Sequence, residues 1–121
     1  MIPPEEVHVE SNLTVRSSRP RPDVTVVEVA GELDTATVPQ LATSLDTGTR
    51  HVGVDLSGLT FVDSSGIEVL VRARKQALGS LHLVGVQRSR AVTRVLDLFG
   101  LTGEFSQFAD LDALLAELDG A

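Results

Sequence analysis

The sequence predicts an α/β fold in which a mixed β-sheet packs against helices. Short β-branched apolar runs alternate along the chain with segments of helical periodicity. The first two runs lie close enough to form an antiparallel hairpin, whereas the later ones are separated by the helical crossovers that parallel strands require. We expect one domain of four to five strands and about four helices, which suits 121 residues of which 42% are hydrophobic.

The strands are predicted from apolar runs bounded by glycine, proline, aspartate or serine. The expected strands are Leu13–Ser17, Val24–Ala30, His51–Leu56, Leu81–Val86 and a short one near Glu104–Phe108. Pro20 and Pro22 indicate a loop between the first two, because proline cannot donate to a central ladder.

The helices are predicted from side chains able to cap their first turns. The expected caps are Thr37, Ser65, Ser89 and Asp110. Gln40 and Glu68 lie three residues after the first two caps, which is the spacing of a capping box. The second helix is expected to run to about Leu78 and stop at Gly79. The third carries an apolar face at helical spacing, made of Val92, Val95, Leu96 and Phe99.

Composition excludes several classes of function. The formal charge of −7 argues against a nucleic-acid partner, and the absence of cysteine excludes disulfides and zinc–thiolate sites. No segment resembles a signal peptide or a membrane span, so we expect a cytoplasmic protein that does not bind a membrane. The stretch Arg72–Arg94 has six basic residues and no acid, whereas Asp97–Ala121 has six acids and no base. These are either two functional faces or ordinary solvated helix surfaces.

Two strand-to-helix turns are the candidate functional site. Such turns form the edge of an open α/β sheet where ligands and partners dock. The candidate partner-binding residues are Gly31, Glu32, Asp34 and Thr35 in one turn, and Asp63, Ser64, Ser65 and Gly66 in the other.

Ser64 is the candidate for modification. If Ser65 caps the helix, the hydroxyl of Ser64 has no structural duty, and a phosphate there would lie near the helix N-terminus. The alternative is that Asp63, Ser64 and Ser65 merely compete to cap one helix. Asp34 is similarly ambiguous: it either forms a turn with its own backbone, or leaves its carboxylate available to a partner because Thr37 supplies the cap.

Enzymatic chemistry is not expected. A serine nucleophile needs a general base, and His8, His51 and His82 are expected in the N-terminal segment and at strand starts. The sequence has no Gly-x-Ser-x-Gly motif, no calcium loop and no phosphate-binding loop that ends in Gly-Lys-Ser or Gly-Lys-Thr. We therefore predict no catalytic residue, no metal site and no cofactor.

Four segments of the chain resemble one known family. They are Val26–Leu41 with Gly-Glu-Leu-Asp, His51–Val71 with Asp-Ser-Ser-Gly, Leu81–Val86, and Arg90–Leu101. In this order they resemble the STAS domains, named for sulfate transporters and anti-sigma factor antagonists, and especially the free-standing bacterial antagonists. The resemblance implies a STAS domain over residues 11–121, preceded by an N-terminal extension over residues 1–10.

The resemblance also implies a function. In that family the unphosphorylated antagonist binds an anti-sigma factor that is itself a serine kinase, and thereby releases a sigma factor for transcription. The position of Ser64 is the phosphorylation site, and that of Asp34 belongs to the partner surface. Phosphorylation ends binding, and a serine phosphatase reverses it. The chain would thus be a regulatory substrate rather than an enzyme, and its oligomeric state stays open. The alternative is a scaffold or subunit of a stressosome-like or membrane transport complex.

Overall fold

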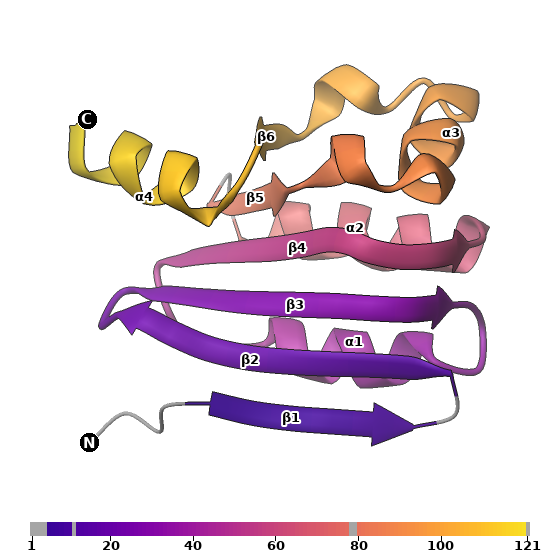
Figure 1. Cartoon of the computed structure of the whole chain (residues 1–121), viewed down its shortest axis with the longest axis horizontal. Helices are drawn as coiled ribbons and strands as arrows, with labels where there is room; N and C mark the ends of the chain where they lie inside the picture. The colour runs from indigo at the N-terminus through magenta and orange to yellow at the C-terminus, as the bar shows by residue number, and fades with distance from the viewer. Residues whose placement is uncertain (1–4, 11, 78–79, 121) are drawn as a thin grey trace.

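The computed structural model describes residues 5–10, 12–77 and 80–120, and contains one six-stranded sheet with four α-helices (Figure 1). The strands are β1 (Glu5–Glu10), β2 (Leu13–Arg21), β3 (Val24–Leu33), β4 (His51–Val62), β5 (Leu81–Val84) and β6 (Ser106–Phe108). The α-helices are α1 (Val38–Leu45), α2 (Ser64–Gln76), α3 (Arg90–Leu98) and α4 (Leu111–Gly120). Two short 3-10 helices are η1 (Val86–Arg88) and η2 (Thr102–Glu104).

The sheet is mixed, and its strands stand side by side in chain order. β1 and β2 pair antiparallel, as do β2 and β3, which confirms the predicted hairpin. The remaining three pairings are parallel, and α1, α2 and α3 supply the crossovers between them. The predicted α/β class and mixed sheet are therefore confirmed.

The expected number of strands was too low, because β1 was not predicted. It occupies Glu5–Glu10, within the stretch expected to be an N-terminal extension, and pairs with β2 over its whole length. The backbone supplies the hydrogen bonds of an edge strand, so a segment rich in glutamate can form one without a hydrophobic signature. The domain boundary at residue 11 stays a prediction.

The main hydrophobic core lies between one face of the sheet and the crossover helices, with α1 and α2 behind the sheet in Figure 1. Its members come from every central strand and from three helices, and they include Val27, Val54, Leu41, Leu70 and Leu96. On the opposite face α4 buries Leu114 over Gly53, where an added Cβ would lie 2.8 Å from the leucine Cδ2. The helices thus hold the central strands from both sides.

The caps of the last two helices are as predicted. The Ser89 hydroxyl accepts from the Val92 amide at 3.2 Å, and Asp110 accepts from Ala113 at 2.8 Å. The apolar face of α3 is shorter than expected, because Phe99 is the residue that ends the helix and is 55% exposed. Helical spacing no longer decides a side chain's direction once the last turn has ended.

Two further boundaries can be compared with the structure. β2 continues through Pro20, and the loop between the hairpin strands is confined to Pro22–Asp23. The register with β3 shifts between Ser18 and Arg21, so proline sits at an irregularity, where the lost ladder bond costs little. α2 ends at Gln76, and the predicted stop at Gly79 lies outside the described residues.

His82 is a buried polar side chain at the start of β5. Its Nδ1 lies 2.9 Å from Ser106 Oγ and its Nε2 lies 3.3 Å from His51 Nδ1, at the opposite end of β4 from Ser64. Burial, and secondarily the charge of His51, lower the pKa of His82 from its ordinary value of 6.5. A neutral ring can donate through one nitrogen and accept through the other, so it can satisfy both contacts.

This lowered pKa predicts a pH-dependent stability. The unfolded chain takes up a proton near pH 6.5 more readily than the folded chain, so the stability conferred by His82 is present above pH 6.5 and is lost as pH falls through the folded pKa. We expect the unfolding free energy, measured by urea titration between pH 7.5 and 5.5, to fall with pH less steeply in His82→Gln than in the wild type. Equal slopes would show that His82 contributes nothing.

Candidate functional site

The two predicted turns meet at one edge of the sheet, at the carboxyl ends of β3 and β4 (Figure 1). Leu33 and Val62 are register partners at the ends of these parallel strands. The Asp63 amide donates to the Leu33 carbonyl at 3.2 Å, so the first residue after β4 is tied to the last residue of β3. The backbone therefore brings the segment after Leu33 beside the segment after Val62.

In the first turn, Asp34 is the residue that organises the backbone. Its Oδ1 accepts from the amides of Ala36 at 3.0 Å and Thr37 at 3.1 Å. The Thr37 hydroxyl donates back to the Glu32 carbonyl at 2.9 Å and makes no capping bond to α1. The capping box predicted for Thr37 is wrong, and one oxygen of Asp34 is occupied within the turn. Thr35 is exposed at its tip.

In the second turn, Asp63 rather than Ser65 caps α2. Its Oδ1 accepts from the amides of Ser65 at 2.9 Å and Gly66 at 3.3 Å, and from the Ser65 hydroxyl at 2.5 Å. A carboxylate out-competes a hydroxyl here because it accepts charge-assisted hydrogen bonds and complements the positive end of the helix. The predicted Ser65 cap is wrong by two positions, since α2 begins at Ser64.

Ser64 is the first residue of α2, and its side chain is exposed. Its hydroxyl makes no hydrogen bond within the described part of the chain, whereas the hydroxyl of Ser65 is bonded to Asp63. Sequence reasoning singled out the correct unoccupied hydroxyl although it named the wrong cap.

The two glycines of the predicted site have structural roles. Gly31 has φ of +103°, and a Cβ there would lie 2.0 Å from the Asn12 carbonyl oxygen. Gly66 is buried, and a Cβ on it would lie 2.8 Å from atoms of both Leu33 and Val62. Gly31 permits close approach of the chain before β2, and Gly66 lets the first turn of α2 lie directly on the ends of β3 and β4.

A groove of about 520 Å³ begins at Ser64 and follows α2. We call it the α2 groove; its lining residues are Ser64, Ile67, Glu68, Val71, Arg72, Lys75, Phe99 and Leu101. Sequence reasoning did not find it, because it forms where α2 meets the end of α3, far away in the chain. Phe99 could have indicated the groove from sequence, because a large apolar residue that follows the last regular turn of a helix need not point into the core.

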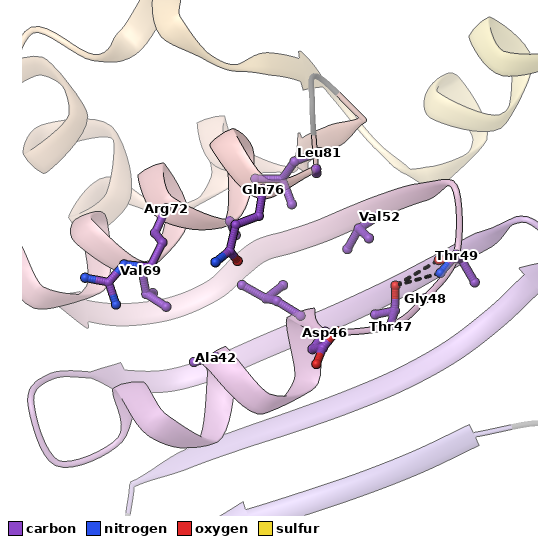
Figure 2. A pocket seen from close by; sticks show the side chains of 13 residues that line it. Ala42, Asp46, Thr47, Gly48, Thr49, Val52, Val69, Arg72, Gln76 and Leu81 are labelled. Carbon is purple, nitrogen blue, oxygen red and sulfur yellow. Dashed lines mark hydrogen bonds between the residues drawn. The ribbon is translucent and has the colours of Figure 1, made fainter.

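A separate cavity of about 230 Å³ lies between α1, α2 and the segment that leads into β4 (Figure 2). Its wall is mixed: the apolar residues Ala42, Val52, Val69 and Leu81 lie beside the polar residues Asp46, Thr47 and Thr49, with Gln76 reaching down from α2. None of the predicted site residues lines it. Arg72 borders both this cavity and the α2 groove.

The two histidines whose side chains the structure describes, His51 and His82, lie away from the Ser64 edge. His51 begins β4 and Ser64 follows its end, which separates them by roughly 35 Å of extended strand. Among the described side chains, no three histidine, aspartate or glutamate groups gather as metal ligands. Over the same part of the chain, no helix has both the length and the apolar character that would let it cross a membrane.

Comparison with known proteins assigns the family. The model of the STAS domain matches residues 17–114. The chain belongs to the STAS family. Both turns of the candidate site fall inside the matched range.

Relatives of this STAS domain include the anti-sigma-B factor antagonist of Staphylococcus epidermidis, which is 37% identical over 82 residues; the match covers 62% of this chain and 74% of that protein. The crystal structure of an anti-sigma factor antagonist from Mycobacterium paratuberculosis superposes with a TM-score of 0.67 at 26% identity, covering 93% and 92% of the two chains. Unphosphorylated SpoIIAA, an anti-sigma factor antagonist, shares the fold with a TM-score of 0.67 at 22% identity, covering 88% and 97%. SpoIIAA of Bacillus has also been solved phosphorylated, with a TM-score of 0.61 at 19% identity, covering 83% and 96%.

The capping arrangement of α2 predicts different costs for two neighbouring substitutions. Asp63→Ala removes the acceptor of two amides and should lower the unfolding free energy by about 1 kcal/mol. Ser64→Ala removes a hydroxyl without a partner and should change it by less than about 0.5 kcal/mol. Urea denaturation of both variants measures the difference, and an equal loss would contradict the assignment of the cap to Asp63.

The conformation of Gly31 predicts a severe effect of a single methyl group. Gly31→Ala combines positive φ with a backbone collision and should cost more than about 2 kcal/mol. Gly48→Ala is the matched control, because Gly48 also has positive φ, +73°, but no atom lies within 4 Å of its added Cβ. Its cost should stay near 1 kcal/mol in the same urea assay. If the two variants lost the same unfolding free energy, the collision with the Asn12 carbonyl would not contribute to the cost.

Proposed function

We propose that this chain is a cytoplasmic anti-sigma factor antagonist controlled by phosphorylation of Ser64. In its unphosphorylated form it binds an anti-sigma factor with serine kinase activity, and so releases a sigma factor. The bound kinase phosphorylates Ser64 and ends the interaction, and a serine phosphatase restores it. The names of its relatives support the antagonist role, since they include an anti-sigma-B factor antagonist at 37% identity.

The observation that carries the proposal is the state of the Ser64 hydroxyl. It is exposed, it has no hydrogen-bond partner among the described residues, and it lies beside a cap that does not need it. A kinase can therefore reach Ser64 Oγ without first breaking an interaction that holds the helix. The oxygen would attack the γ-phosphorus of ATP, losing its proton while ADP departs. Base, nucleotide and metal would belong to the kinase.

Phosphorylation would change the surface more than the fold. Asp63 already caps α2, so the helix begins in the same way with or without phosphate. The modification adds about −1.5 to −2 charges next to Asp63 and beside the turn that holds Asp34. Burying such a group against a partner is costly, and a penalty of about 3 kcal/mol weakens binding roughly a hundredfold.

Some of the remaining predicted site residues would hold the turns in shape, and the others would contact the partner. Gly31 and Gly66 shape the backbone, and Ser65 is bonded to Asp63. The partner would contact the outer surface of the turns through Glu32, Asp34 and Thr35, and would cover Ser64. Asp63 would act by fixing the direction of α2.

The proposal predicts a separation of phosphate uptake from binding. Incubated with ATP and the anti-sigma factor kinase, the wild type should gain one phosphate, and Ser64→Ala should gain none while still binding. Ser64→Glu should bind about a hundredfold more weakly and remain folded. Intact-mass spectrometry, calorimetric titration and circular dichroism measure these three properties.

Ser65→Ala is the control for the first arm, because it removes the neighbouring hydroxyl and should leave phosphate uptake intact. Phosphate on Ser64→Ala, or undiminished binding by Ser64→Glu, would contradict the switch. Constitutive association with a stressosome-like or membrane transport complex, unaffected by either variant, would favour the scaffold alternative.

A further inference from the structure

The α2 groove combines an apolar floor with a basic rim. Its floor is apolar, with buried Ile67, partly buried Val71 and Leu101, and half-exposed Phe99. Its rim carries Arg72 and Lys75, both exposed. Glu68 is its only acid, so the groove has a formal charge of +1 on a molecule whose net charge is −7.

The two cations of the rim are not used by the fold. Within the described residues neither Arg72 nor Lys75 has a hydrogen bond or an ion pair. Arg74, on the same helix, provides a contrast: it donates to the Glu104 carbonyl and lies 5.3 Å over the Phe105 ring. Arg74 therefore has a packing role, and Arg72 and Lys75 present their charges to solvent.

Ser64 lies at one end of this surface. Arg72 follows it by eight residues and Lys75 by eleven, which places the cations about 12 and 16 Å along the helix axis. All three line the same groove. A partner segment of about three helical turns would cover Ser64 and both cations together.

We infer that the α2 groove receives an acidic, amphipathic segment of the anti-sigma factor, and that phosphorylation of Ser64 releases this segment by reversing the charge of the groove. Apolar side chains of the segment would pack on Phe99 and Leu101, and its carboxylates would face Arg72 and Lys75. The inference rests on the proposed function and specifies both the chemistry of the partner and the reason that binding ends.

The charge reversal follows from the groove's few titratable groups. Phosphoserine carries about −1.5 to −2 charges, which changes the formal charge of the groove from +1 to between about −0.5 and −1. Glu68 lies one helical turn from Ser64, so the phosphate joins a carboxylate on the same face. A segment attracted by the unmodified groove is then repelled by it.

The first test is a charge swap at the cations. In calorimetric titration against the anti-sigma factor at 50 mM salt, unphosphorylated Arg72→Glu/Lys75→Glu should bind about tenfold or more weakly than the wild type. The matched control is Arg90→Glu/Arg94→Glu, which makes the same change in net charge at two exposed arginines of α3 that do not line the α2 groove. The control should bind within about threefold of the wild type. The difference in affinity between Arg72→Glu/Lys75→Glu and the wild type should shrink at 0.5 M salt.

The second test separates charge from steric obstruction. Glu68→Lys introduced into Ser64→Glu returns the groove to a positive charge, so the double variant should recover at least about tenfold of the lost affinity. Glu68→Lys alone supplies the baseline. No recovery would mean that the group at position 64 blocks the partner by its bulk, and the charge mechanism would be overturned.

The outcomes distinguish this inference from the proposed function. If the wild type binds no anti-sigma factor, the proposed function fails, and the groove inference fails with it. If the wild type binds and Arg72→Glu/Lys75→Glu binds equally well, only the groove inference fails. The wild type is also tested for self-association by sedimentation and for binding to phosphatidylglycerol vesicles. If Arg72→Glu/Lys75→Glu abolished one of these interactions and left anti-sigma factor binding intact, the groove would be a site for a second copy of the chain or for a membrane surface instead.

Discussion

The parallel pairing of β3 with β4 is the constraint on which the site depends. Parallel strands end at the same edge of a sheet, so the chain must leave both strands on one side before it enters α1 and α2. The bond from the Asp63 amide to the Leu33 carbonyl fixes how closely the two exits approach. Gly66 then allows the first turn of α2 to lie directly on Leu33 and Val62. A site assembled from two distant segments is thus positioned mainly by backbone geometry.

In both strand-to-helix turns the backbone is held by an aspartate carboxylate, which accepts hydrogen bonds from backbone amides. Asp34 closes the turn before α1, and Asp63 caps α2 while also accepting from Ser65. Both residues could be mistaken for purely functional acids, because they stand at an exposed edge near a serine that we propose to be modified. Their carboxylates hold the turns in shape, and we propose that a partner contacts the surface that those turns present.

The order of elements was predictable because it depends on local periodicity and capping. Ser89 and Asp110 cap the helices expected of them, and the candidate turns were located correctly. The features that the sequence did not predict depend on competition between adjacent residues for one role, or on contacts between segments far apart in the chain. Three adjacent residues able to cap one helix cannot be ranked without their geometry, so the capping-box spacing favours Ser65 although Asp63 is the cap. β1 gave no hydrophobic signal, and the α2 groove unites residues that are some thirty positions apart. The packing of α3 on α2 creates that groove, and no local pattern encodes it.

The cap formed by Asp63 has a consequence for the lifetime of a modified state. If a phosphate on Ser64 had to serve as the acceptor for the amides of Ser65 and Gly66, it would be gripped by the helix, and a hydrolytic enzyme would have to pull it away. Asp63 already accepts from those amides, so a phosphate on Ser64 would stay in solvent at the start of α2. The same arrangement that leaves the hydroxyl available for modification would thus leave the ester open to hydrolysis. In the proposed switch, a phosphatase would reach the phosphate on Ser64 as easily as a kinase reaches the hydroxyl.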